Sequence, residues 1–240
     1  MSQREAGICY YNNSGQGSTI TRELVANLFE KLEEHMSSDY FRDFVSRSRV
    51  PNERELYGLF VRSLLESTNS NIDHVATEFQ VQRCEGDDGV GTKGRVDLFF
   101  NYRSVSYLVE LKVGRINARG EDRDPKKRAR KIWKTAIQQL NDLTINSVDG
   151  LLEKKIVKLP IAIYFFDSTK LVDGHESIDF GNLHDRICSF IECDEDGLDI
   201  KPDFHQFRDI PHIDTRLRKT NVGEECNNYI YGFSFFGKQM

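Results

Sequence analysis

Several features that would assign this chain of 240 residues to a specialised protein class are missing. The five cysteines are an odd number without the spacing of a small disulfide-stabilised domain, which favours reduced thiols. The first residues carry no basic start followed by an apolar core, so no secretory signal is expected. The longest apolar run, Leu159 to Phe166, is far shorter than the roughly 20 residues of a membrane helix. We therefore expect a soluble, cytoplasmic protein that does not enter a membrane.

The chain also lacks an excess of positive charge and several well-known fingerprints. Its net charge is −5, from 33 Lys and Arg against 38 Asp and Glu, so any contact with a polyanion must come from local clustering. The glycine-rich NNSGQGST segment has no following lysine of a phosphate-binding loop. No Ser-His-Asp order and no dinucleotide-binding fingerprint appear. The composition is that of an ordinary globular protein, and the simplest expectation is one α/β domain with additions.

Apolar spacing predicts the order helix, three strands, helix and strand for the middle of the chain. Pro51-Asn52-Glu53 is a typical helix start, and Pro125 opens a second helix whose buried side would include Trp133 and Leu140. The expected elements are helices over residues 19–36 and 51–67, a strand over 74–84, a hairpin over 95–113, a helix from 125, a strand over 155–166, a helix over 182–192 and a strand over 228–236. Residues 1–49 would form an arm and a packing helix, 50–168 the core, and 169–240 an elaboration of the same domain.

The hairpin GRVDLFFNYRSVSYLVELKVG sets three charged residues into two apolar runs. A turn centred between Arg103 and Ser104 would place Asp97 opposite Glu110, with Cβ atoms roughly 5 Å apart. Two carboxylates held that close repel each other unless a cation or a shared proton neutralises them, and a divalent metal ion is the natural candidate. Lys112 follows Glu110 by two residues, so the strand period places it on the same face. A register slip of one residue would separate the carboxylates.

A basic segment follows the hairpin. Residues 115–134 contain nine Lys or Arg and three Asp or Glu, which makes six net positive charges. Such a run is either a solvated helix face or a surface that contacts phosphates, and its start three residues after Lys112 favours the second interpretation. The candidate nucleic-acid-binding residues, together with the arginine two positions before Asp97, are Arg95, Arg115, Arg119, Lys126, Lys127, Arg128, Arg130 and Lys131.

The residues Gly94-Arg95-Val96-Asp97, twelve intervening positions and then Glu110-Leu111-Lys112, within this order of elements, resemble the PD-(D/E)xK nuclease superfamily. That superfamily includes restriction endonucleases, Holliday-junction resolvases, repair exonucleases and anti-phage effectors. The resemblance covers roughly residues 50–166, and Val96 replaces the family's proline. It implies a restriction-endonuclease-like α/β core, α-β-β-β-α-β, with a mixed sheet between helices, and a Mg²⁺-dependent DNA endonuclease activity, with restriction or anti-phage defence as one setting.

The resemblance also implies roles for individual residues. Asp97, Glu110 and the Leu111 carbonyl would hold one or two Mg²⁺ ions, with Mn²⁺ expected to substitute. Lys112 would orient or help deprotonate the attacking water and offset charge in the transition state. Related proteins often add a glutamate from the first core helix, for which Glu53 is the candidate and Glu55 the reserve.

Some exonuclease-type relatives also use a glutamine in a Gln-apolar-x-x-Tyr pattern. Gln139 fits this pattern, except that Leu143 replaces the tyrosine. Because one active site cuts one strand, a homodimer is expected if the activity is double-strand cleavage.

Alternative interpretations remain open at this stage. The same core could be a non-catalytic module that binds nucleic acid or protein, or the site could belong to a different metallo-hydrolase. The three charges could also form an ion pair on an exposed strand. His184, Cys188 and Cys193 have a spacing that could hold zinc, with Cys226 or His205 as a guess for a fourth ligand, although buried thiols beside an exposed histidine are the more common arrangement.

Overall fold

The structure is a computed structural model. It describes residues 8–9, 18–47, 51–69, 71–85, 91–117, 125–143, 155–168, 201–202, 205–206, 213–219, 225–237 and 240. The helices are α1 (Ser18–Met36), α2 (Asp39–Arg47), α3 (Glu53–Ser67) and α4 (Pro125–Asn141). The long strands are β2 (Asp73–Glu85), β3 (Gly91–Tyr102), β4 (Val105–Asn117), β5 (Lys155–Ser168), β8 (Ile213–Lys219) and β9 (Glu225–Gly237). The short strands are β1 (Ile8–Cys9), β6 (Lys201–Pro202) and β7 (His205–Gln206).

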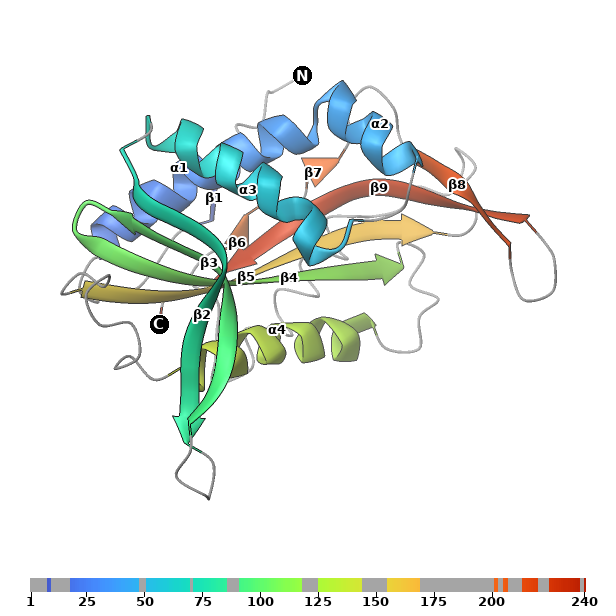
Figure 1. Ribbon diagram of the computed structural model, residues 1–240. Helices are drawn as coiled ribbons and strands as arrows, with labels where there is room; N and C mark the ends of the chain where they lie inside the picture. Colours follow the sequence, from blue (N-terminus) through green and yellow to red (C-terminus); the bar gives the residue numbers. More distant parts are fainter. Residues whose placement is uncertain are drawn as a thin grey trace.

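A mixed sheet forms the centre of the molecule. Its strand order is β2-β3-β4-β5-β9-β7, and β8 pairs with β9. Strands β4 and β5 are parallel, and the remaining pairs of this sheet are antiparallel. The parallel pair needs a crossover, which α4 supplies. Helices α1, α2 and α3 cover one face of the sheet and α4 covers the other (Figure 1). The chain is therefore an α/β protein with a mixed sheet between helices.

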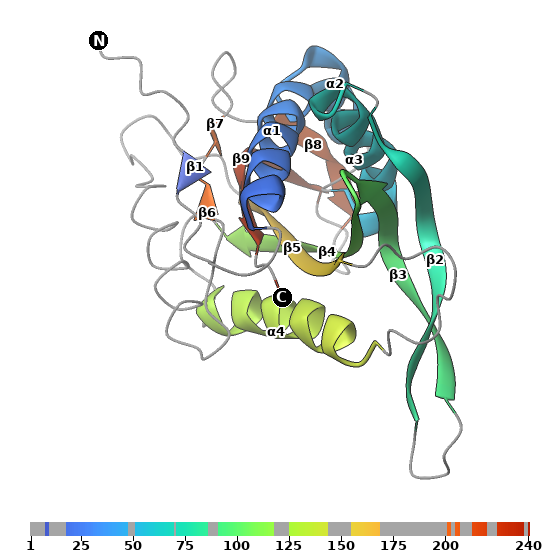
Figure 2. The same cartoon turned by 90° about the vertical axis from the view of Figure 1, so that its left-hand side faces the viewer.

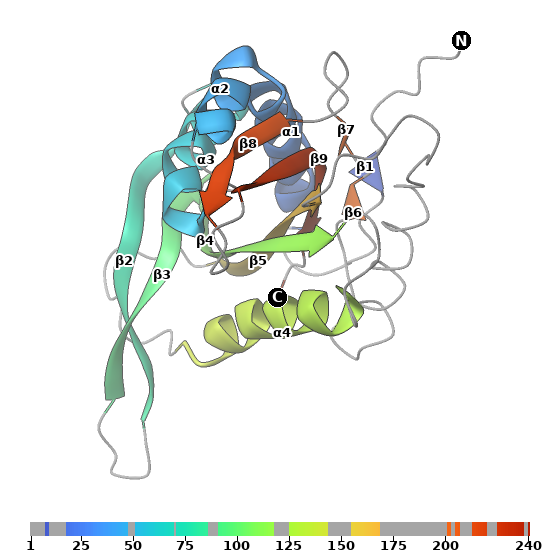
Figure 3. The same ribbon diagram turned by 90° about the vertical axis from the view of Figure 1, so that its right-hand side faces the viewer.

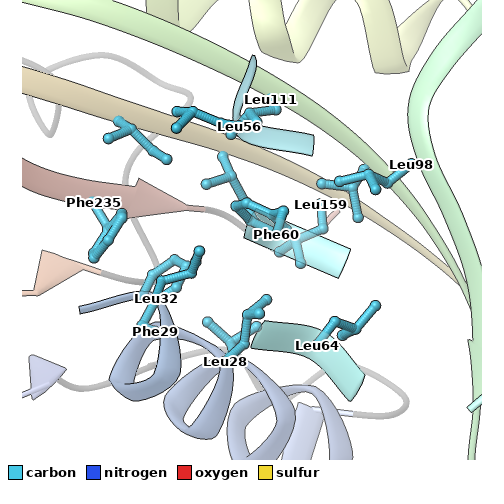
Figure 4. Close-up of a cluster of buried hydrophobic side chains, with 14 of the residues drawn as sticks. Leu28, Phe29, Leu32, Leu56, Phe60, Leu64, Leu98, Leu111, Leu159 and Phe235 are labelled. Atoms are coloured by element: carbon cyan, nitrogen blue, oxygen red, sulfur yellow. The ribbon is translucent and has the colours of Figure 1, made fainter. Parts of the chain in front are cut away.

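Two apolar clusters hold the layers together. The larger one joins α1, α2 and α3 to the inner strands, and it includes Leu56 of α3 and Leu111 of β4 (Figure 4). The smaller one lies on the other face and joins Leu140 and Leu143 to Val96 and Leu108. Strand β4 is buried along most of its length because it packs under helices on both faces. Leu56, near the start of α3, belongs to the same cluster as Leu111 in the middle of β4.

The β3–β4 hairpin has the predicted turn and register. Asn101 pairs with Ser106 and Tyr102 with Val105, which leaves Arg103 and Ser104 as a two-residue loop. Both loop residues have positive φ, 49° and 59°. Two consecutive residues of this kind match the right-handed twist of the flanking strands, which is why such tight loops set a hairpin's register.

A break in strand alternation occurs midway along β3. Val96 and Phe99 pack in the same apolar cluster although they are three residues apart. The paired residues of β3 and β4 end at Leu98 and Val109, one position before Asp97 would face Glu110. On β2 the residue opposite Asp97 is Glu78, which has a φ of 51° and lies between two regular pairs. Both strands therefore lose their period of two at the same point.

Beyond the break, the outer part of the β2–β3 hairpin leaves β4, because the pairs of β3 with β4 end at Leu98 and Val109. The far end of this hairpin extends past α4 in all three views (Figures 1, 2 and 3). The period-two alternation predicted for 74–84 is wrong beyond Thr77, because Ala76 and Phe79 pack on the same cluster. A positive φ in the middle of a strand inverts the side-chain pattern, and no residue type at Glu78 signals it.

The remaining differences from expectation lie at the ends of the chain. No helix was predicted between residues 36 and 51, but Asp39–Arg47 forms α2, whose Phe41 and Val45 are buried. The expected closing strand is present as β9 and pairs with β5. The expected helix at 182–192 lies outside the described residues. Within the described part of the chain, no helix combines the length and the apolar character needed to cross a bilayer.

Candidate functional site

Lys112 lies at the centre of a group of oxygen atoms from three elements. Its ammonium Nζ is 2.7 Å from Oε1 of Glu110 and 3.2 Å from the carbonyl oxygen of Leu111, both in β4. Oε2 of Glu53 in α3 is 3.4 Å away, and Oδ2 of Asp97 in β3 is 3.8 Å away. We call these five residues the carboxylate–lysine cluster. The structure thus brings together the three charged residues of the hairpin and the predicted helix glutamate.

The start of α3 decides which of its two glutamates reaches the cluster. Asn52 caps the helix, and its Oδ1 accepts a hydrogen bond of 3.1 Å from the Glu55 backbone N–H. The Glu55 carboxylate in turn accepts one of 2.7 Å from the Asn52 N–H. This reciprocal capping box occupies Glu55 at the helix end. Glu53 is therefore the glutamate of α3 that extends toward Lys112, and the reserve candidate Glu55 has a structural role.

Asp97 is held by two donors. The backbone N–H of Leu111 donates to its Oδ2 at 2.8 Å, and the hydroxyl of Tyr57 in α3 donates to its Oδ1 in a short hydrogen bond. Burial, followed by the Asp97 carboxylate, raises the pKa of Tyr57, so its hydroxyl keeps its proton and remains a donor. This contribution of Tyr57 was not predicted from the sequence. Its position one helical turn after Glu53 on α3 is the signal that could have found it.

The cluster becomes more exposed from the sheet outward. The exposed fraction of the side chain is 3% for Glu110, 12% for Lys112, 16% for Asp97 and 36% for Glu53. Burial by itself would lower the pKa of Lys112, but the carboxylates, led by Glu110, outweigh it and raise this pKa above its ordinary 10.5. The lysine is thus a permanent cation near neutral pH. In the absence of a metal ion it acts as a positive charge and a hydrogen-bond donor rather than as a base.

The donor atoms of the cluster suit a hard divalent cation. Four oxygens, three from carboxylates and one from a backbone carbonyl, lie within 4 Å of the Lys112 Nζ. Carboxylate and carbonyl oxygens are the ligands that Mg²⁺ prefers. The formal charge also fits, because three carboxylates and one ammonium leave two net negative charges. Among the described residues, no group of three or more His, Cys, Asp or Glu side chains is already arranged as a metal site.

The candidate DNA-binding residues fall into two groups. Helix α4 buries Ala129 and Trp133 against the sheet, and its solvent face carries Lys127, Arg128 and Lys131, with Arg130 half-buried. This helix lies on the opposite face of the sheet from α3 (Figure 1). The predicted basic helix face is therefore present. Lys126 lies in the first turn of α4, and Arg119 lies outside the described residues.

Two other arginines of the predicted set are bound to acidic residues. Arg115 pairs with Asp167 of β5, with Nε donating at 2.9 Å, and both side chains are mostly buried. Arg95 pairs with Glu78 of β2 at 3.4 Å. Arg115 therefore ties β4 to β5 and is poorly placed for a phosphate, whereas the Arg95 side chain is 57% exposed.

Two further sets of candidates were predicted away from the hairpin. Gln139 is half-buried on α4. The zinc candidates His184, Cys188 and Cys193 lie outside the described residues. His205 is in β7 and Cys226 in β9, two strands that pair at His205 and Phe233.

Comparisons with known proteins return no relative. No protein-family model matches the chain, and searches of curated proteins and of solved structures find no match either.

Proposed function

We propose that this chain is a metal-dependent nuclease of the PD-(D/E)xK type, with a restriction-endonuclease-like core, that hydrolyses phosphodiester bonds in DNA. The observation that supports it most is the carboxylate–lysine cluster. Asp97, Glu110, Glu53 and the Leu111 carbonyl converge on Lys112 where β3 leaves β4. Burial of a group with a formal charge of −2 is unfavourable in free energy unless a bound cation neutralises the charge. This net charge matches one divalent ion.

Each member of the cluster has a distinct task in this proposal. Asp97, Glu110 and the Leu111 carbonyl would hold Mg²⁺, with Glu53 as an outer carboxylate. A bound Mg²⁺ supplies Lewis-acid polarisation of a phosphate oxygen and lowers the pKa of a bound water. Tyr57 and the Leu111 N–H orient the Asp97 carboxylate.

Lys112, held as a cation, stabilises negative charge on the phosphate as water attacks phosphorus. The bond from the water oxygen to phosphorus forms as the phosphorus–oxygen bond to the leaving sugar breaks. Overall, one proton of the attacking water ends on the leaving oxygen, which gives a phosphate monoester and a free hydroxyl. Water is the nucleophile, so no covalent enzyme intermediate forms.

Incubation of the purified protein with plasmid and linear DNA, in Mg²⁺ or in EDTA, tests the proposal. We expect cutting that EDTA abolishes, and we expect Asp97→Asn and Lys112→Ala to lose it at least a hundredfold, since removed electrostatic groups typically cost about 10²–10³ in rate. Asp39→Asn is the matched control, because Asp39 is fully exposed on α2. Circular dichroism shows that each variant remains folded. Cutting by Asp97→Asn at the rate of Asp39→Asn would refute the assignment of the site.

The second candidate is a non-catalytic module on the same core that binds nucleic acid or protein. It is favoured by the position of Lys112, whose ammonium already contacts all three carboxylates and could be a purely structural cation. DNA binding without any metal-dependent cutting, combined with a loss of stability in Lys112 variants, would favour this candidate.

Light scattering adds the oligomeric state, because double-strand cleavage by the nuclease predicts a homodimer.

A further inference from the structure

Two exposed arginines share one carboxylate beside the carboxylate–lysine cluster. Nη2 of Arg54 in α3 lies 2.9 Å from Oε1 of Glu78, and Nη1 of Arg95 in β3 lies 3.4 Å from its Oε2. The two guanidinium side chains are 71% and 57% exposed. We call Arg54 and Arg95 the arginine pair. Each arginine binds a different oxygen of the same acceptor, so the pair surrounds one small anionic group.

The arginine pair is adjacent to the cluster along each chain segment. Arg54 directly follows Glu53, and Arg95 precedes Asp97 by two residues, roughly 7 Å along a strand. Glu78 lies opposite Asp97, between the pairs Thr77–Leu98 and Phe79–Val96. A chain of phosphates with one phosphate at the cluster would place a neighbouring phosphate near the arginine pair.

The backbone of Glu78 is unusual for its position. Its φ of 51° lies in the left-handed region, which costs a non-glycine residue about 1 kcal/mol or more. Strain of this kind persists where the surrounding structure holds it, and it concentrates at binding and catalytic sites. The pairing of β2 with β3 keeps its register across this point, from Thr77–Leu98 to Phe79–Val96, and the Glu78 carboxylate contacts both arginines.

We propose that the arginine pair binds a DNA phosphate next to the one at the carboxylate–lysine cluster, and that Glu78 occupies this phosphate position in the absence of DNA. The planar guanidinium groups donate parallel N–H bonds that match phosphate oxygens as well as carboxylate oxygens. Exposed ion pairs contribute little stability, so replacement of the Glu78 carboxylate by a phosphate in the contacts with the arginine pair costs little folding stability. This inference rests on the proposed function for the nature of the polyanion.

The test is the binding of a short fluorescein-labelled DNA duplex, measured by fluorescence anisotropy over a series of salt concentrations in EDTA. Each lost phosphate contact reduces the salt slope by about 0.9. Because the pair contacts one phosphate, the double variant Arg54→Gln with Arg95→Gln should bind more weakly and with a slope flatter by about 1. Arg62→Gln is the control, because Arg62 is on the same helix, 66% exposed and paired with Glu66. The salt slope of DNA binding should change much less in the Arg62→Gln variant.

Glu78→Gln tests the second half of the proposal. Removal of the internal competitor should tighten DNA binding more than Glu34→Gln does, although both changes remove one negative charge. Glu34 pairs with Lys31 on α1 and is exposed. Replacement of both arginines of the pair by lysine keeps the charge and removes the planar donors, so the slope should remain while the affinity falls.

The outcomes separate this inference from the proposed function. An unchanged slope in the double glutamine variant, or equal affinities of the Glu78→Gln and Glu34→Gln variants, overturns the arginine pair even if metal-dependent cutting is observed. The absence of any DNA binding by the wild-type protein overturns it as well. A flatter slope without any cutting supports the arginine pair and refutes the nuclease.

Discussion

Replacement of Lys112 by methionine should destabilise this protein strongly, because it removes the cation next to a buried carboxylate. The Nζ of Lys112 lies 2.7 Å from Glu110, and the two side chains are 12% and 3% exposed. At an effective dielectric constant of about 20, that distance corresponds to a gross attraction of about 6 kcal/mol. Desolvation offsets part of it, and removal of one partner of such a pair typically costs about 3–5 kcal/mol. We expect a loss in that range.

Urea denaturation followed by circular dichroism measures this loss of stability. A double variant then shows which part of the loss comes from the uncompensated charge of Glu110. In the double variant Lys112→Met with Glu110→Gln no uncompensated charge remains at that pair, so it should recover part of the stability lost by Lys112→Met alone. Lys31→Met is the matched control, because the Lys31–Glu34 distance is also 2.7 Å but the pair is exposed. This control should lose far less. The reasoning is refuted if Lys112→Met and Lys31→Met lose the same stability, or if the double variant recovers nothing.

The same pair predicts a dependence on pH in the alkaline range. The folded-state pKa of Lys112 is raised above the ordinary 10.5, so its contribution to stability is fully present below that value and is lost as pH rises through the folded pKa. The stability of the wild-type protein relative to Lys112→Met should therefore fall above about pH 10.5 and remain constant below it. A difference that grows with rising pH would contradict the sign.

Three further substitutions test the geometry around the site. Ser104→Gly relieves a φ of 59° in the hairpin loop and should raise the free energy of unfolding by about 0.5–1 kcal/mol; a lower stability in urea would contradict the turn. Gly114→Ala would place a Cβ 2.5 Å from Cδ1 of the buried Tyr164 ring, so the thermal midpoint should fall with a loss of about 1–3 kcal/mol, and an unchanged midpoint would refute this packing. Tyr57→Phe removes the hydrogen bond to Asp97 and should lower the free energy of unfolding by about 1–3 kcal/mol and slow cutting in Mg²⁺; wild-type values for both would show that Tyr57 does not hold Asp97.

Local pattern was sufficient to predict much of the scaffold. The periodicity of α4 located its buried side, including Trp133 and Leu140, because a 3.6-residue repeat depends only on neighbouring residues. The turn at Arg103-Ser104 followed from a short polar break between two apolar runs, and a two-residue loop sets the register of both strands. The predicted proximity of Glu110 and Lys112 followed from the strand period alone, because both residues lie in β4.

Other features depended on contacts between distant segments. Helix α2 was missed because its short apolar pattern is surrounded by charge, and the burial of Phe41 and Val45 against the large cluster stabilises it. Tyr57 and Arg54 gained a place at the site only when α3 packed over β4. The choice between Glu53 and Glu55 depended on the capping box at Asn52, which local sequence could have indicated.

The sequence by itself determined which side chains are available at the hairpin and that Glu110 and Lys112 share one face of β4, since these follow from residue order and the strand period. Tertiary structure decided where Asp97 points. A regular hairpin would have set its carboxylate directly across from Glu110, but the paired residues of β3 and β4 end at Leu98 and Val109, and the carboxylate instead accepts from Tyr57 and the Leu111 N–H. That break involves β2, β3 and α3 together, and no single segment carries the information for it.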